Sequence, residues 1–243
     1  STPLYIACFQ GDVDITKLLL NKDADVNLAN QNGLTPLHIS CEKGQFHIAQ
    51  LLLEKGANIN LENNRGKFPL LISCFQGYVD VARLLLDKGA AVDQADKDGW
   101  TPLYAACFQG DVDITKLLLN KDADVNLANQ NGLTPLHISC KMGHVNVIRM
   151  LLDNGADVDR ISEYGHTPLY DACIKGNNNV VRLLLDKGVE ADRKNELGCT
   201  PLWVACNNSH YNIAQRLIKI GADVNCVDNY GCSSLYAVCS NGY

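Results

Sequence analysis

Apolar residues occur along the chain in short runs that alternate with polar segments. Runs of three leucines include residues 18–20, 51–53, 84–86 and 183–185. Three of these runs are followed three residues later by glycine, at Gly56, Gly89 and Gly188. Glycine in the left-handed conformation commonly ends a helix. The pattern therefore predicts a series of short helices, each closed at such a position.

A second regular feature marks where helices begin. The seven prolines stand 33 positions apart, at Pro3, Pro36, Pro69, Pro102, Pro135, Pro168 and Pro201. Six of them follow threonine, and the remaining one follows Phe68. Threonine before proline offers an N-cap hydroxyl and a helix-ready first position. Each proline is therefore predicted to open a first helix.

All 19 glycines fall into three slots of this 33-residue frame. In one unit they are Gly44, which separates two helices, Gly56, which ends the second helix, and Gly66, which lies in a tight hairpin turn. One unit cannot bury its apolar faces alone, so neighbouring units must stack. The predicted repeats start at residues 2, 35, 68, 101, 134, 167 and 200, with a partial repeat at 233.

The motifs at these positions resemble those of ankyrin repeats over the whole chain. They are Thr-Pro-Leu-His at residues 35–38, the leucine runs, and Gly-Ala-Asp-Val-Asn at residues 221–225. The resemblance implies an all-α fold in one domain, residues 1–243. That fold would be an α-solenoid of seven full repeats and a partial eighth, with short β-hairpin loops between helix pairs. It also implies a concave face lined by the hairpin tips and the first helices.

Several residues depart from the repeating pattern. Phe68 replaces an N-cap threonine, and the loss of the cap is expected to cost about 1 kcal/mol. Asp23 and Asp122 stand where glycine closes the other second helices, and Ser209 replaces the glycine between two helices. A non-glycine residue in the left-handed conformation costs on the order of 1 kcal/mol. We expect stacked repeats to absorb these local strains.

One segment of the chain occurs twice. Residues 2–41 and 101–140 are identical except for Ile6 against Ala105, which indicates copying, either in nature or by engineering. The chain opens on a first helix without a polar cap and stops at Tyr243, inside the eighth unit. Solenoids need polar outer faces at both ends. We therefore expect the chain to be a fragment of a longer array.

The charge balance favours some classes of partner over others. Acidic residues outnumber basic ones by 27 to 21, for a net charge of -6, and no block of basic residues occurs. This argues against nucleic acid or an anionic membrane surface as the main partner. The apolar runs are far shorter than the roughly 20 residues that span a bilayer, so no membrane insertion is expected.

The cysteines are the strongest hint of chemistry in the sequence. Eight of the eleven share one slot of the first helix, at Cys8, Cys41, Cys74, Cys107, Cys140, Cys173, Cys206 and Cys239. Helices pack about 8 to 10 Å apart, too far for disulfides or zinc sites between successive slots. We interpret them as buried small side chains. Reduced thiols indicate an intracellular, cytoplasmic or nuclear, location. Cys199 and Cys232 lie outside the slot and are the expected exposed thiols.

Other pairs of reactive residues have structural explanations. His38 and Cys41 form half a metal site at most, and the ring is expected to bond within its own turn and to the adjacent hairpin. Asp12 and Asp14 open a second helix, where negative charge is favourable. No phosphate-binding loop or catalytic triad is suggested. We therefore expect no catalytic residue, no metal and no cofactor.

In ankyrin-like stacks, the residues after the cysteine slot and beside the hairpin glycine choose the partner. Three of the five phenylalanines lie in the first of these sets. The candidate partner-binding residues are Phe9, Gln10, Leu34, Lys67, Phe75, Gln76, Trp100, Phe108, Gln109, Leu133, Met142, Tyr164, His166 and Ile174. An exposed row of apolar and aromatic groups is typical of an interaction surface. The alternative is that each phenylalanine only packs on its neighbouring hairpin.

These observations favour a monomeric, non-catalytic scaffold that binds a protein or peptide on its concave face. One alternative is the targeting arm of a larger enzyme, channel or ubiquitin-ligase adaptor, and another is an engineered array without a biological partner. A third alternative is a role as a substrate, because arrays of the family that this chain resembles can be hydroxylated at an asparagine with leucine eight residues earlier. The candidates are Asn27, Asn60, Asn126 and Asn225.

Overall fold

The computed structural model describes residues 2–240, which form fifteen helices and no β-strand. The first helices of the successive pairs are α1 (Pro3–Gln10), α3 (Pro36–Glu42), α5 (Pro69–Gln76), α7 (Pro102–Gln109), α9 (Pro135–Met142), α11 (Pro168–Lys175), α13 (Pro201–Asn207) and α15 (Ser234–Ser240). The second helices are α2 (Val13–Leu20), α4 (Phe46–Glu54), α6 (Val79–Asp87), α8 (Val112–Leu119), α10 (Val145–Asp153), α12 (Asn178–Asp186) and α14 (Tyr211–Lys219). Gly242, which the glycine frame includes, lies outside the described residues.

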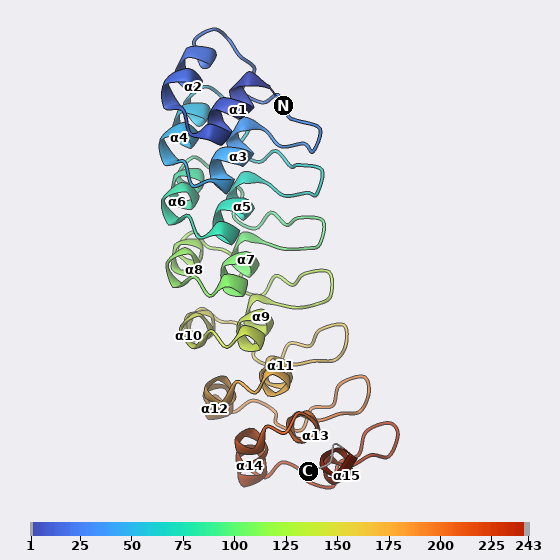
Figure 1. Cartoon of the computed structure of the whole chain (residues 1–243). Coiled ribbons are helices and arrows are strands. Elements are labelled where there is room, and N and C mark those ends of the chain that lie inside the picture. Colours follow the sequence, from blue (N-terminus) through green and yellow to red (C-terminus); the bar gives the residue numbers. More distant parts are fainter. Residues whose placement is uncertain (1, 241–243) are drawn as a thin grey trace. The chain divides into compact units, whose positions relative to one another are not determined.

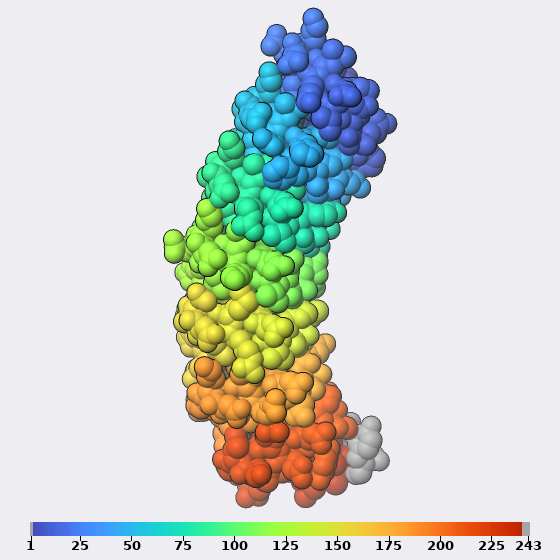
Figure 2. Space-filling model, turned by 90° about the vertical axis from the view of Figure 1, so that its left-hand side faces the viewer, coloured from blue at the N-terminus to red at the C-terminus, as the bar shows by residue number. Residues whose placement is uncertain are grey.

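The helix pairs form two compact units, unit 1 (residues 1–124) and unit 2 (residues 125–243). Within each unit, first helices pack on first helices and second helices on second helices, in chain order, while the loops project on the side of the first helices (Figure 1). Figure 2 shows the side that the second helices form, where the successive pairs of a unit follow one another as coloured bands. The predicted all-α solenoid architecture is confirmed. That one domain spans residues 1–243 stays a prediction.

The threonines before the prolines fix the starts of six first helices. In each, the threonine side chain accepts a hydrogen bond from the backbone N–H three residues later, at 3.1 to 3.4 Å. Phe68 makes no such bond, as the sequence predicts, but its side chain is fully buried. Burial of a phenylalanine contributes about 1.5 to 3 kcal/mol. At this position an apolar contact therefore offsets the missing cap.

The predicted left-handed positions are confirmed. Asp23, Asp122 and Ser209 have φ values of 57°, 60° and 59°. Gly66, in the loop before α5, has φ +74°, and a Cβ there would lie 2.8 Å from the backbone nitrogen of Lys97. Glycine at this position therefore allows the loops of two successive repeats to lie against each other.

The loops between the helices of residues 2–240 reverse the chain by turns and contain no strand. In the first of them, the N–H of Asn30 donates to the carbonyl of Leu34, and the N–H of Gly33 donates to the carbonyl of Asn30, both at 2.9 Å. Between Val227 and Ser233 there is an isolated β-bridge, the one bridge that stands outside strands in the described chain. The expected hairpin shape is thus present, but within residues 2–240 turn hydrogen bonds close it and no β-ladder forms.

The cysteine slot lies in the core for most of its length. Six of the eight cysteines are fully buried, whereas Cys206 is half-buried and Cys239 is exposed. All eleven cysteines lie among the described residues, and no disulfide joins them there. Burial raises the pKa of the Cys41 thiol to about 12, so the thiol stays protonated and unreactive.

The expectation of an exposed Cys199 was wrong. This residue is 5% exposed, and burial raises the pKa of its thiol to about 11. Its backbone N–H donates to the Asn195 side chain at 2.9 Å. Cys232, in the same position of the next loop, is half-buried.

Candidate functional site

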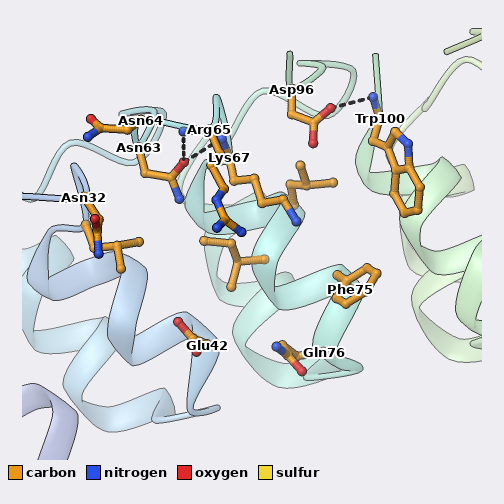
Figure 3. Close-up of a pocket in the computed structure, with 13 residues that line it drawn as sticks. Asn32, Glu42, Asn63, Asn64, Arg65, Lys67, Phe75, Gln76, Asp96 and Trp100 are labelled. Atoms are coloured by element: carbon orange, nitrogen blue, oxygen red, sulfur yellow. Dashed lines mark hydrogen bonds between the residues drawn. The ribbon is translucent and has the colours of Figure 1, made fainter. Parts of the chain in front are cut away.

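A groove of about 430 Å³ lies between the loops and the first helices of unit 1. We call it the loop groove, and Figure 3 shows it in close-up. Its walls come from three successive loops and its floor from α3 and α5. Its lining residues are Asn32, Leu34, Glu42, Asn63, Asn64, Arg65, Lys67, Leu71, Ile72, Phe75, Gln76, Asp96 and Trp100.

Polar side chains at the loop starts hold the walls of the groove in shape. The Oδ1 atom of Asn63 accepts the backbone N–H groups of Arg65 and Lys67 at 2.8 and 3.1 Å. The Oδ1 atom of Asp96 accepts the N–H of Trp100 at 2.8 Å, and both arrangements are visible in Figure 3. Because the backbone is fixed in this way, the side chains of Arg65, Lys67 and Trp100 project from defined positions.

His38 ties one of these loops to the helix layer. The N–H of Thr35 donates to Nδ1 at 3.1 Å, so Nε2 carries the proton and donates to the carbonyl of Lys67 at 3.2 Å. Burial lowers the pKa of this histidine, which keeps the ring neutral. The prediction that the ring bonds within its own turn and to the adjacent hairpin is confirmed. His38 is therefore a positioning residue for Lys67.

Aromatic rings form one end of the groove. Phe75 and Phe108 are stacked with their centroids 6.2 Å apart, and Trp100 lies 6.2 Å from Phe75 and 5.3 Å from Phe108. Behind them, the buried Tyr104 ring lies 4.9 Å from Trp100. Phe75, Trp100 and Phe108, which we call the ring cluster, are each half-buried, so they both pack and expose apolar surface.

The groove carries positive charge beside these rings. The Lys67 ammonium lies 5.3 Å from the centroid of Phe75, a cation–π distance. Arg65 is exposed, and neither cation makes an ion pair with a described residue. Among the acidic lining residues, the Asp96 carboxylate is buried against the backbone and Glu42 is half-buried. The groove thus offers two cations and an apolar surface to a ligand.

The structure brings together part of the predicted partner-binding set. Leu34, Lys67, Phe75, Gln76 and Trp100 line the loop groove, and Phe108 joins them through the ring cluster. The other predicted members from unit 1 do not line the groove; they are Phe9, Gln10 and Gln109. Whether any of these residues binds a partner stays a prediction. The set lacks Arg65, and it lacks Leu71 and Ile72, which are buried core residues that also line the groove.

Two of these remaining residues have defined contacts. The Gln109 amide donates to the Phe75 carbonyl at 2.8 Å, which extends the packing around the ring cluster. Phe9 is 52% exposed and has the Lys43 ammonium 4.9 Å above its ring. The alternative that every phenylalanine packs on a neighbouring loop therefore holds for Phe75, next to Trp100, but does not describe Phe9.

The other predicted residues belong to unit 2: Leu133, Met142, Tyr164, His166 and Ile174. Met142 and Tyr164 are exposed, and the other three are half-buried. The Tyr164 and His166 rings lie 6.1 Å apart.

Asp171, on α11, is an unexpected charged residue near this second group. It is 2% exposed, its Oδ1 atom lies 3.4 Å from Nδ1 of His166, and its Oδ2 atom has no hydrogen-bond partner. The equivalent position of other repeats holds an apolar residue, such as Ile72 or Ile138. Alignment of the repeats in their 33-residue frame would have revealed it.

The candidate hydroxylation sites take part in contacts between neighbouring repeats. Asn27 donates to the carbonyl of Gly56 at 3.2 Å, and Asn126 donates to that of Gly155 at 3.1 Å. The side chain of Asn60 accepts the N–H of Ala91 at 3.0 Å, while Asn225 is exposed. Modification at these residues stays a prediction.

Two further observations concern residues 2–240. Nowhere in this range do three histidine, cysteine or acidic side chains gather in a way that could hold a metal ion. No helix within it has the length and apolar character needed to cross a membrane.

Family models match nearly the whole chain. A model described as ankyrin repeats (3 copies) matches residues 1–63, 56–129 and 122–195, and a single ankyrin repeat model matches residues 197–229. A search of curated proteins gives no match.

Proposed function

Because the chain belongs to the ankyrin repeat family, whose repeats are generally protein–protein interaction modules, we propose that it is a non-catalytic scaffold that binds a protein or peptide in the loop groove. The groove lies on the face of the loops and first helices, which would be the concave face of an ankyrin array. In this proposal the chain is an intracellular monomer, cytoplasmic or nuclear.

One observation carries the proposal. The ring cluster keeps three aromatic side chains half-exposed next to cations that no described carboxylate neutralises. Aromatic and arginine side chains dominate binding energy at protein interfaces, and the groove brings both kinds together. The acidic net charge of -6 favours a protein over a nucleic acid as this partner.

The experiment selects peptides for binding and then removes the ring cluster. A phage-displayed library of random peptides is selected on the whole chain, and the affinity of the selected peptides is measured by fluorescence polarisation. The Phe75→Ala, Trp100→Ala and Phe108→Ala triple variant is expected to weaken binding more than about tenfold, because these rings supply the apolar contact. Phe75→Ala alone is the milder variant, because it leaves Trp100 packed on Tyr104.

Tyr211→Ala is the matched control, because this aromatic residue is 72% exposed on α14, in the layer of second helices. Circular dichroism checks that each variant is folded. Peptides that bind the folded triple variant as tightly as the wild type would disprove the proposed groove.

A further inference from the structure

We propose that the loop groove recognises an extended peptide segment that carries a carboxylate side chain and, about three residues away, an apolar side chain. This inference rests on the proposed function, because it names the class of partner for the same groove. It is argued from the placement of an apolar subsite and a cationic subsite on successive repeats.

The apolar subsite is the surface that Phe75 and Trp100 present to the groove. Their rings pack against each other, tilted by 52° with centroids 6.2 Å apart. Leu71 and Ile72 form a buried apolar floor beside them. A leucine or an aromatic side chain of a ligand would complete this set of contacts, because aromatic groups prefer offset or edge-to-face neighbours.

The cationic subsite lies one loop earlier. Arg65 and Lys67 flank Gly66, and Figure 3 shows both side chains directed over the groove. The Lys67 ammonium is held at the border of the apolar subsite by its contact with the Phe75 ring. A carboxylate there would receive charge-assisted hydrogen bonds, and arginine can hold it through two parallel bonds.

The spacing of the subsites sets the spacing within the ligand. Packed helices lie about 8 to 10 Å apart, and an extended chain rises about 3.3 Å per residue. The Lys67 ammonium already reaches the Phe75 ring, so Arg65 marks the far end of the cationic subsite. A peptide that runs from Arg65 to Trp100 of the next repeat therefore covers one repeat spacing in about three residues.

A charge swap tests the inference with the whole chain. Peptides selected from the random library are expected to share an acidic residue about three positions from an apolar one. The Arg65→Glu, Lys67→Glu double variant should weaken their binding about tenfold or more, and a peptide with lysine in place of the acid should recover about tenfold on that variant. Recovery cannot come from a loss of folding.

The control is a second charge-reversed double variant, Lys22→Glu with Arg83→Glu. Both residues are exposed in unit 1 and lie outside the groove, so this variant changes the net charge equally and should leave binding within about twofold.

The outcomes separate the two proposals. Selected peptides that lose binding in Phe75→Ala but carry no shared acid, or that ignore the charge reversal, would overturn the inference and leave the proposed function standing. Tighter binding of a phosphoserine peptide than of its glutamate version would also overturn it. Peptides unaffected by either the ring or the charge variants would overturn the proposed function as well.

Discussion

The same amino-acid sequence occurs twice in unit 1, in two environments. We call residues 2–23 the first copy and residues 101–122 the second copy; they differ only at Ile6 and Ala105. Ile15 of the first copy is 45% exposed, whereas Ile114, its counterpart in the second, is fully buried. Identical local sequence thus gives identical helices but unequal cores.

The difference comes from the neighbouring repeats. In the second copy, α7 packs on α5 and α8 packs on α6. In the described part of the chain, the first copy has no such preceding helix pair, and its neighbours are the following helices α3 and α4. Leu18 of α2 is consequently 61% exposed, while Leu117 of α8 is 6% exposed. Burial in this fold is therefore a property of the stack, as expected when each repeat contacts only its neighbours.

The largest expected effect is on stability, because the same substitution should cost more in the second copy than in the first. Ile114→Ala should lower the free energy of unfolding by about 2 to 5 kcal/mol, because it opens a cavity in a filled core. Ile15→Ala should cost much less, since its side chain is nearly half exposed. Urea denaturation of the whole chain, followed by circular dichroism, measures both. Equal losses in the two variants would mean that the two copies are equally covered in solution.

Peptide affinity is the second property in which the two copies should differ. Phe108 of the second copy lies in the ring cluster, whereas its counterpart Phe9 is 52% exposed and contacts the Lys43 ammonium. Phe108→Ala should weaken binding of groove-selected peptides about fivefold or more, and Phe9→Ala should change it less than about twofold. Fluorescence polarisation measures both affinities. If Phe9→Ala had the larger effect, the binding surface would lie on the first copy instead.

Local chemistry explains what could be predicted from the sequence. The start of a helix depends on a threonine hydroxyl and a proline at fixed positions, as at Thr35 and Pro36, and its end depends on a left-handed residue. These signals act within a few residues, so they predicted the helices and even the left-handed Asp23 and Asp122. The candidate residues Phe75 and Trp100 followed from the same repeating frame.

Contacts between repeats explain what could not be predicted. Ile15 and Ile114 are indistinguishable in local sequence, so their different burial depends on which repeats lie beside them. Cys199 was expected to be exposed because it follows a loop glycine, but it is 5% exposed, whereas Cys232 in the same position of the next loop is half-buried. Residues around each loop, not the position in the frame, therefore decide this burial. Asp171 required a comparison of equivalent positions across repeats, because nothing beside it in the chain marks it as buried.

The copied helices that contain His38 and His137 provide a test of pH dependence. Burial lowers the pKa of both histidines, and for His137 the nearby Asp171 opposes this effect. The unfolded chain therefore takes up these protons first, and the free energy of unfolding should fall as the pH drops below about 6.5 toward the folded pKa values. Each histidine contributes at most about 1.4 kcal/mol per pH unit in this window. Urea midpoints measured from pH 7.5 down to pH 5, values chosen to bracket about 6.5, report the loss.

A single substitution should change the pKa of His137 and leave that of His38 as it is. Asp171→Asn removes the charge that raises the pKa of His137, so the pKa of His137 should fall further while that of His38 stays unchanged. NMR titration of the imidazole resonances of the whole chain follows both groups. Equal shifts for the two histidines, or none for His137, would contradict the electrostatic role of Asp171.

The smallest expected effect is one in which the two copies should agree. Asp23 and Asp122 have φ values of 57° and 60° at the ends of α2 and α8. Glycine carries no Cβ and adopts this conformation without strain, so Asp23→Gly and Asp122→Gly should each raise the free energy of unfolding by up to about 1 kcal/mol. Both residues are exposed, so the gain depends on backbone geometry, which the copies share, and not on burial, which they do not. Urea denaturation of the two variants measures it; a gain confined to one copy would show that stacking also controls the backbone strain.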